Sequence, residues 1–152
     1  MPLDGLTPKT VSVFLAGSIE MGQAVDWQRE VVQLLQTPPL PQDLIVLNPR
    51  RDDWDASWTQ SITNPQFRAQ VEWELMAQER ASLILMYFAP TTKAPITLLE
   101  LGLFARSGKL VVCCPEGFWR RGNVEVVCAW YGVPMVATLA DLVAVVRERL
   151  AE

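Results

Sequence analysis

The stretch SLILMYFA, Ser82–Ala89, decides the fold class of this chain of 152 residues. Apart from its first residue the run is almost wholly apolar, so both faces of the strand that it predicts are apolar. A strand of this kind is typical of a parallel sheet with helices packed on each side. A second such run, KLVVCCP at Lys109–Pro115, follows a helical pattern. The two runs together predict an α/β domain.

The alternation of strand and helix patterns continues on both sides of these runs. β-rich segments predict further strands at Thr10–Gly17, Leu44–Pro49 and residues 134–138. Helical spacing predicts helices at Ala24–Gln36, from the cap Asn64 and Pro65 to about Arg80, at Ile96–Ser107 before Gly108, at Asn123–Tyr131, and from Leu139 onward. We therefore expect one domain over residues 1–152, with a doubly wound five-stranded parallel sheet in the order 2-1-3-4-5 and helices on both faces.

The charge pattern excludes several classes of partner. The formal net charge is −4 and the Lys and Arg residues are scattered, so no basic patch for a nucleic acid polymer or an anionic membrane is expected. No apolar run approaches the ~20 residues of a membrane helix, and MPLDGLTPKT reads as a short polar leader. We expect a cytoplasmic protein that binds a small molecule.

The chain contains no histidine, which removes imidazole acid-base chemistry, His metal sites and His-dependent nucleophiles together. Carboxylates are then the expected catalytic groups if the chain is an enzyme. The three cysteines have no CxxC spacing, and Cys113, Cys114 and Cys128 are expected to be small buried residues. Neither a metal nor an organic cofactor is expected.

In a sheet of the predicted order, the ligand crevice lies beyond the carboxyl ends of the strands. Carboxylates and tryptophan dominate the segments that follow those ends, which suits a sugar-bearing aromatic ligand. Glu72 and Glu74, on the helix before SLILMYFA, point in different directions, so at most one of them faces the crevice. The other residues expected there are Ser18, Glu20, Asp52, Asp53, Trp54, Asp55 and Glu100.

Glu100 stands inside the apolar run PITLLELGLF, about one turn into its predicted helix. There the free N–H groups and the helix dipole would stabilise a carboxylate, and a rigid ionised carboxylate can act as the nucleophile of glycosyl transfer. The structural alternative is that Glu100 caps the helix or pairs with Arg106 or Lys109.

Two loops allow other interpretations. GSIEMG after the first strand matches neither phosphate-binding glycine pattern, and Glu20 would repel a phosphate, so a tight strand-to-helix turn is favoured. The acids of RRDDWD lack EF-hand spacing, so a charged loop is favoured over a metal site.

Four segments in order, VFLAGSIEMG, NPRRDDWD, QVEWELMAQERASLILMYFAP and APITLLELGLFA, resemble the nucleoside 2-deoxyribosyltransferase superfamily, in its branch of small bacterial proteins. The resemblance spans roughly Val11–Gly132, and its most specific element is Glu-Leu-Gly at residues 100–102. It implies a flavodoxin-like fold and exchange of the base of a 2′-deoxynucleoside through a covalent deoxyribosyl group on Glu100.

The resemblance also implies roles for other residues. Glu74 would assist at the base, and Asn123 would reach the sugar of a neighbouring subunit's substrate, so a homo-oligomer with shared sites is expected. Gly17 and Ser18 of the first turn, together with Asp53 and Trp54, are expected to line the substrate pocket.

Two departures from the family pattern bear on the substrate. Ala94 stands where some transferases carry a second base-contacting acid, which leaves the base preference open. Glu20 stands where related nucleotide N-glycosidases carry an arginine, which favours an unphosphorylated nucleoside. The alternatives to a transferase are a nucleoside or nucleotide N-glycosidase and a non-catalytic nucleotide-sensing or flavin-binding module.

Overall fold

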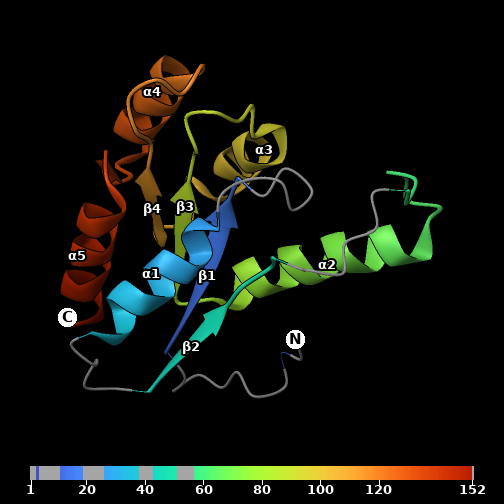
Figure 1. Cartoon of the computed structure of the whole chain (residues 1–152), viewed down its shortest axis with the longest axis horizontal. Helices are drawn as coiled ribbons and strands as arrows, with labels where there is room; N and C mark the ends of the chain where they lie inside the picture. Colours follow the sequence, from blue (N-terminus) through green and yellow to red (C-terminus); the bar gives the residue numbers. More distant parts are fainter. Residues whose placement is uncertain (1–2, 4–10, 19–25, 38–42, 51–56, 152) are drawn as a thin grey trace.

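The computed structural model describes residues 3, 11–18, 26–37, 43–50 and 57–151. Within these residues, strands and helices alternate from beginning to end (Figure 1). The elements are β1 (Val11–Gly17), α1 (Trp27–Gln36), β2 (Leu44–Leu47), α2 (Pro65–Arg80), β3 (Leu83–Tyr87), α3 (Pro95–Phe104), β4 (Leu110–Cys113), α4 (Arg121–Tyr131), β5 (Met135–Val136) and α5 (Leu139–Leu150).

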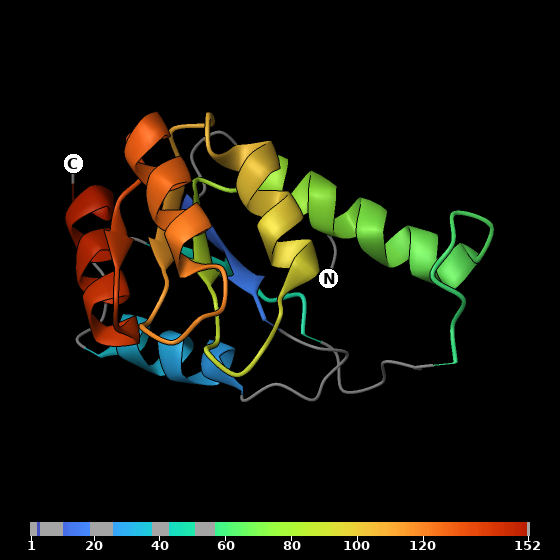
Figure 2. The same ribbon diagram turned by 90° about the horizontal axis from the view of Figure 1, so that it is seen from above.

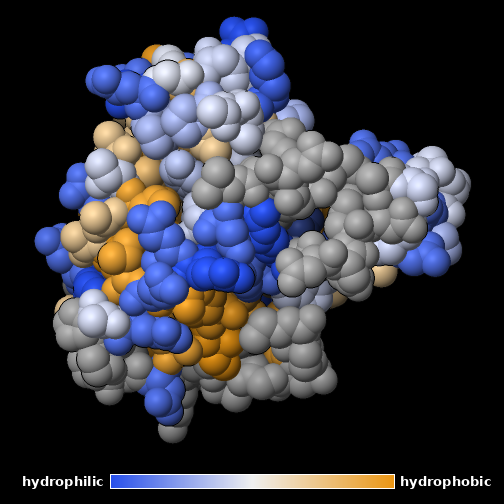
Figure 3. Space-filling model, viewed as in Figure 1, coloured by the Kyte–Doolittle hydropathy of each residue, from blue (hydrophilic) through white to orange (hydrophobic). Residues whose placement is uncertain are grey.

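The five strands form one parallel sheet in the order β2-β1-β3-β4-β5, which confirms the predicted α/β, flavodoxin-like topology. At its carboxyl edge, Gly17 pairs with Tyr87 and Tyr87 pairs with Cys113. The carboxyl ends of β1, β3 and β4 are therefore in register, so the loops that follow these strands start next to one another. β2 is an edge strand with Leu44, Ile45 and Val46 only half-buried, and an apolar area over it is visible in Figure 3.

Helices cover both faces of the sheet, as predicted (Figure 2). Alternate residues of β1 show the division, since Val13 and Leu15 pack with α1 and α5, whereas Phe14 and Ala16 pack with α2, α3 and α4. None of the helices in the described ranges is long and apolar enough to span a membrane.

Some helix ends differ from the sequence prediction. Asn64 caps α2 as expected, because its Oδ1 accepts from the Phe67 N–H (3.0 Å). In contrast, α3 ends at Phe104, three residues before the predicted Ser107, and a turn leads from there to Gly108, which has a φ of 77°. At the start of α3, Ala94 has a φ of 48°, the one positive φ among the described non-glycine residues.

Candidate active site

The end of β1 is tied to the end of β3 at Gly17 and Ser18. A Cβ atom on Gly17 would lie 2.5 Å from the Tyr87 carbonyl oxygen, so only glycine allows this close approach. The Ser18 hydroxyl accepts from the Ala89 N–H (3.0 Å) and shares a hydrogen bond with the Thr92 hydroxyl (2.8 Å). Ser18 is buried. Gly17 and Ser18 therefore hold the end of β1 against the end of β3. Their contact with a substrate stays a prediction.

Helix α3 carries Glu100 as its sixth residue, where the side chain is buried. The free N–H groups of a helix belong to its first four residues, so Glu100 lies beyond the stabilisation expected from the helix start. Burial instead raises the pKa of Glu100 from 4.5 to about 7, although a hydrogen bond from Gln78 lowers it. Desolvation therefore outweighs the hydrogen bond, and the carboxyl titrates near neutral pH.

Helix α2 brings three polar residues toward Glu100 at intervals of four, Gln70, Glu74 and Gln78. Residues so spaced lie along one face of a helix. The Gln78 amide donates from Nε2 to Glu100 Oε2 (2.5 Å) and to the Glu74 carbonyl oxygen (3.2 Å). Gln70 Nε2 donates to Glu74 Oε1 (3.5 Å). These bonds connect the middle of α2 directly to the carboxyl group on α3.

Glu74 and Glu100 form an electrostatically coupled pair. The pKa of Glu74 is raised to about 7, first by burial and then by the charge of Glu100, against a hydrogen bond from Gln70 that lowers it. Two carboxylates that repel each other in a poorly solvated site lose their protons in two steps that belong to the pair. Near neutral pH the pair can therefore hold one negative charge and one proton.

The ion pairs considered as a structural role for Glu100 are not formed. Arg106 donates from NH2 to the Tyr131 hydroxyl (3.1 Å). Lys109 Nζ instead binds the carboxyl end of α2, where it donates to the carbonyl oxygens of Gln78 (2.6 Å), Glu79 (2.7 Å) and Ala81 (3.1 Å). Burial lowers the pKa of Lys109. Both cations that were candidates for neutralising Glu100 are thus engaged elsewhere.

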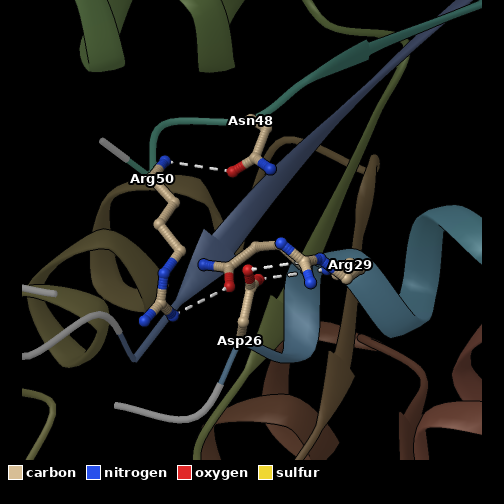
Figure 4. Close-up of polar contacts among 5 residues, drawn as sticks. Asp26, Arg29, Asn48 and Arg50 are labelled. Atoms are coloured by element: carbon tan, nitrogen blue, oxygen red, sulfur yellow. Dashed lines mark hydrogen bonds and ion pairs between the residues drawn. The ribbon is translucent and has the colours of Figure 1, made fainter. Parts of the chain in front are cut away.

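A pocket of about 630 Å³ lies beside the first half of α2 and the segment after β2. Figure 4 shows the wall on the β2 side, where the Arg50 N–H donates to Asn48 Oδ1 (3.0 Å) and the Arg50 side chain donates from NH1 to Gln28 Oε1 of α1 (3.4 Å). Gln70 belongs both to this pocket and to the row that leads to Glu100. Side-chain amides and indoles dominate the lining: Asn48, Pro49, Arg50, Trp58, Gln66, Ala69, Gln70 and Trp73.

A family model described as nucleoside 2-deoxyribosyltransferase like matches residues 10–118. The chain belongs to this family. No curated protein matches the chain. The matched range runs from the start of β1 past the end of β4, so it includes the Glu74–Glu100 pair and the pocket. For a nucleoside 2-deoxyribosyltransferase-like protein, glycosyl transfer is the implied general chemistry, and small nucleosides are the implied substrates.

The two acids of α2 have separate surroundings in this family member. Glu72 is exposed and pairs with Arg68 on the same helix, whereas Glu74 is half-buried and its pKa responds to the charge of Glu100. The different surroundings agree with two acids that point in different directions, and which of them faces a substrate stays a prediction. Sequence reasoning missed Gln70 and Gln78, although their spacing of four residues on either side of Glu74 was a usable signal.

Other predicted residues are not joined to the pair. Asn123 is exposed in the first turn of α4, and no contact among the described residues links it to Glu100. Asp53 and Trp54 lie outside the described residues, as do Glu20, Asp52 and Asp55. Their roles stay predictions.

The three thiols are buried, as predicted. Burial raises the pKa of Cys113 to about 12 and the pKa values of Cys114 and Cys128 to about 11, so these thiols remain protonated and unreactive at neutral pH. Within the described part of the chain, no cluster of three or more acids, cysteines or histidines could hold a metal ion.

Proposed function

We propose that the protein transfers the 2-deoxyribosyl group of a 2′-deoxynucleoside between nucleobases through a covalent intermediate on Glu100. The observation that carries this proposal is the pair of half-buried Glu74 and buried Glu100 at the carboxyl edge of a nucleoside 2-deoxyribosyltransferase-like fold. Covalent glycosyl transfer requires one carboxylate that attacks and a second group that handles the proton of the leaving base.

In the first step, a carboxylate oxygen of Glu100 bonds to C1′ while the C1′–N bond breaks and its electron pair passes to the base. Glu74 donates its proton to the departing base and becomes ionised. The charge on Glu100 favours the protonated form of Glu74, so the two carboxyls divide the roles of nucleophile and acid. In the second step, a new base attacks C1′, Glu100 leaves as a carboxylate, and Glu74 takes a proton from the incoming base.

The pocket beside α2 supplies groups suited to a nucleobase. Trp58 and Trp73 offer flat surfaces for stacking, and Asn48, Gln66 and Gln70 offer both donors and acceptors. Asp53 and Trp54 are expected to add to this lining. Neither a metal nor an organic cofactor is needed for the two steps.

Incubation with 2′-deoxyinosine and adenine tests the reaction. Transfer produces 2′-deoxyadenosine and hypoxanthine, whereas an N-glycosidase produces hypoxanthine and free deoxyribose. A nucleotide N-glycosidase would act on 2′-deoxyinosine 5′-phosphate in preference. The absence of product from every deoxynucleoside and deoxynucleotide would refute both enzymes and leave a binding module.

We also propose that the protein is a homo-oligomer that assembles through α3 and α4, which run side by side in Figure 2. Their exposed apolar residues are Ile96, Leu99, Leu103, Val126, Trp130 and Tyr131. Such a set, with a polar rim, is on the scale of the ~800 Å² that each partner contributes to a standard interface. Asn123 lies on the same α4, so a second copy on this face would meet the residue that the family resemblance assigns to a neighbouring site.

Sedimentation velocity tests the assembly. Leu99→Lys combined with Trp130→Lys should yield a monomer, whereas the matched change Ile62→Lys, in the exposed turn before α2, should leave the oligomer intact. Mixed oligomers of inactive Glu100→Ala and inactive Asn123→Ala subunits should recover part of the activity. A monomeric wild type, or no recovery in confirmed mixed oligomers, would contradict the shared site.

A further inference from the structure

Gln78 is a polar side chain that is buried in apolar surroundings. It lies two residues before the end of α2, is 0 % exposed, and has apolar core residues such as Ala77 and Ala81 near it in the chain. Burial of an amide is costly unless its polar atoms are paired. The side chain therefore requires an explanation beyond packing.

Two fixed points hold this residue. Its backbone carbonyl oxygen accepts from Lys109 Nζ (2.6 Å), which reaches across from the residue before β4. Its side-chain Nε2 donates to the Glu74 carbonyl oxygen one turn earlier (3.2 Å). The remaining direction of Nε2 is occupied by Glu100 Oε2 (2.5 Å). Gln78 thus connects the end of α2 rigidly to one oxygen of the proposed nucleophile.

The other end of the amide has no partner. Gln78 Oε1 is the one buried side-chain polar atom without a hydrogen bond among the described residues. A glutamine retained only for the stability of the core would be expected to pair both ends, because an unpaired buried acceptor costs free energy. In this orientation both N–H groups of the Gln78 amide donate hydrogen bonds, and its oxygen accepts none.

The orientation has a chemical consequence. An amide that points its N–H at a carboxyl group favours the ionised carboxylate, whereas the reversed amide would point Oε1 at Glu100 and favour the protonated acid. The cations nearest in sequence, Arg106 and Lys109, bind other groups, and burial opposes the ionisation of Glu100. The Gln78 amide is therefore the group in the described site that favours the anion.

We propose that Gln78 is a positioning residue that holds Glu100 Oε2, keeps the carboxylate ionised and leaves Oε1 of Glu100 as the oxygen that attacks C1′. This inference rests on the proposed role of Glu100 as nucleophile. The amide of Gln78, on α2, thus determines which of the two carboxylate oxygens of Glu100 on α3 acts as the nucleophile.

The test replaces Gln78 by Met, which keeps the length of the side chain and removes the donor. Glu72→Gln is the matched control on the same helix, because Glu72 is exposed and directed away from the pair. Carbon-13 NMR of protein labelled at glutamate side-chain carboxyls, with the Glu100 signal assigned from Glu100→Gln, measures the titration of that group without reference to turnover.

In Gln78→Met the Glu100 titration should move upward by about one pH unit or more, because a hydrogen bond to the anion is lost. The acidic limb of the kcat profile should move upward with it, and kcat at pH 7 should fall roughly 10- to 100-fold. Glu72→Gln should change neither. A purely structural role would lower the melting temperature and leave the titration in place.

An unchanged Glu100 titration in folded Gln78→Met protein would overturn the proposal. If that variant does not fold, Gln78→Glu replaces the amide by a group of nearly the same shape and should raise the Glu100 titration further, since like charge opposes ionisation. Wild type that performs no transfer, together with a shifted titration, would refute the proposed function while retaining the control of Glu100 by Gln78.

Discussion

The two faces of the sheet have similar apolar cores but differ in the titratable residues that they bury. On the α1 and α5 face, an apolar cluster runs from Val13 and Leu15 in β1 to Leu142 and Val146 in α5, and the buried polar residue of α1, Gln28, is a neutral amide. On the α2, α3 and α4 face, a comparable cluster adjoins the buried acid Glu100 and the buried amide Gln78. The first face stabilises the fold, and the second uses part of that stability to keep titratable groups out of water.

The largest expected effect is the loss of chemistry in Glu100→Gln. Turnover should fall by at least about 10³-fold, because the amide cannot form the glycosyl ester, while the fold is retained. Transfer from 2′-deoxyinosine to adenine measures the rate, and circular dichroism checks the fold. On the opposite face, Glu30→Gln in the exposed first turn of α1 should keep wild-type activity. Activity of Glu100→Gln within tenfold of wild type would remove the contrast between the faces.

The reverse contrast is expected from Leu142→Ala in α5. Leu142 is 0 % exposed, so its truncation should lower the free energy of unfolding by about 2–5 kcal/mol. The kcat of the folded fraction should be unchanged, because the site lies across the sheet. Urea unfolding measures the stability, and rates corrected for the folded fraction measure kcat. A large change in corrected kcat would show that the two faces are coupled.

The pH dependence of stability should come mainly from the charged face. The pKa values of Glu74 and Glu100 are raised by burial from 4.5 to about 7, so the unfolded chain releases these protons first. The stability that they contribute is full below pH 4.5 and is lost as pH rises toward 7, by on the order of 3 kcal/mol for each group at most. Urea unfolding at a series of pH values should show this slope in wild type, and Glu74→Gln with Glu100→Gln should flatten it. Equal slopes in both proteins would contradict the buried pair.

The smallest expected effect concerns the hydrogen bonds from Lys109 to the carboxyl end of α2. Lys109→Met removes three hydrogen bonds to carbonyl oxygens and should lower stability by about 1–3 kcal/mol. Lys109→Arg, which keeps charge and donors, should lose less. Thermal unfolding compares the two. Equal losses would mean that packing of the side chain, and not its donors, stabilises the end of α2.

Apolar patterning was sufficient to predict the sheet. SLILMYFA and KLVVCCP lie at the centre as β3 and β4, and the order of all five strands follows from right-handed crossovers between parallel neighbours. The end of α3 was predicted less well, because Ser107 is a plausible helical residue whose hydroxyl instead binds the Phe104 carbonyl oxygen (2.6 Å) and helps to close the turn.

The candidate site was predictable in its residues and not in its electrostatics. Glu100 could be singled out because an acid is rare in so apolar a run, and the family resemblance chose Glu74 over Glu72. Their raised pKa values could not, because desolvation depends on side chains from both α2 and α3 that only the tertiary structure brings together. The spacing of Gln78 from Glu74 was visible in the sequence, but its contact with Glu100, 22 residues away, was not.

The left-handed Ala94 has an evolutionary consequence. This conformation costs an alanine about 1 kcal/mol, and aspartate adopts it more readily. The side chain is nonetheless 3 % exposed within the core, where a new carboxylate would be poorly solvated. A lineage that gained an acid here would need compensating changes nearby. The position is therefore open to aspartate in backbone conformation and closed to it by solvation.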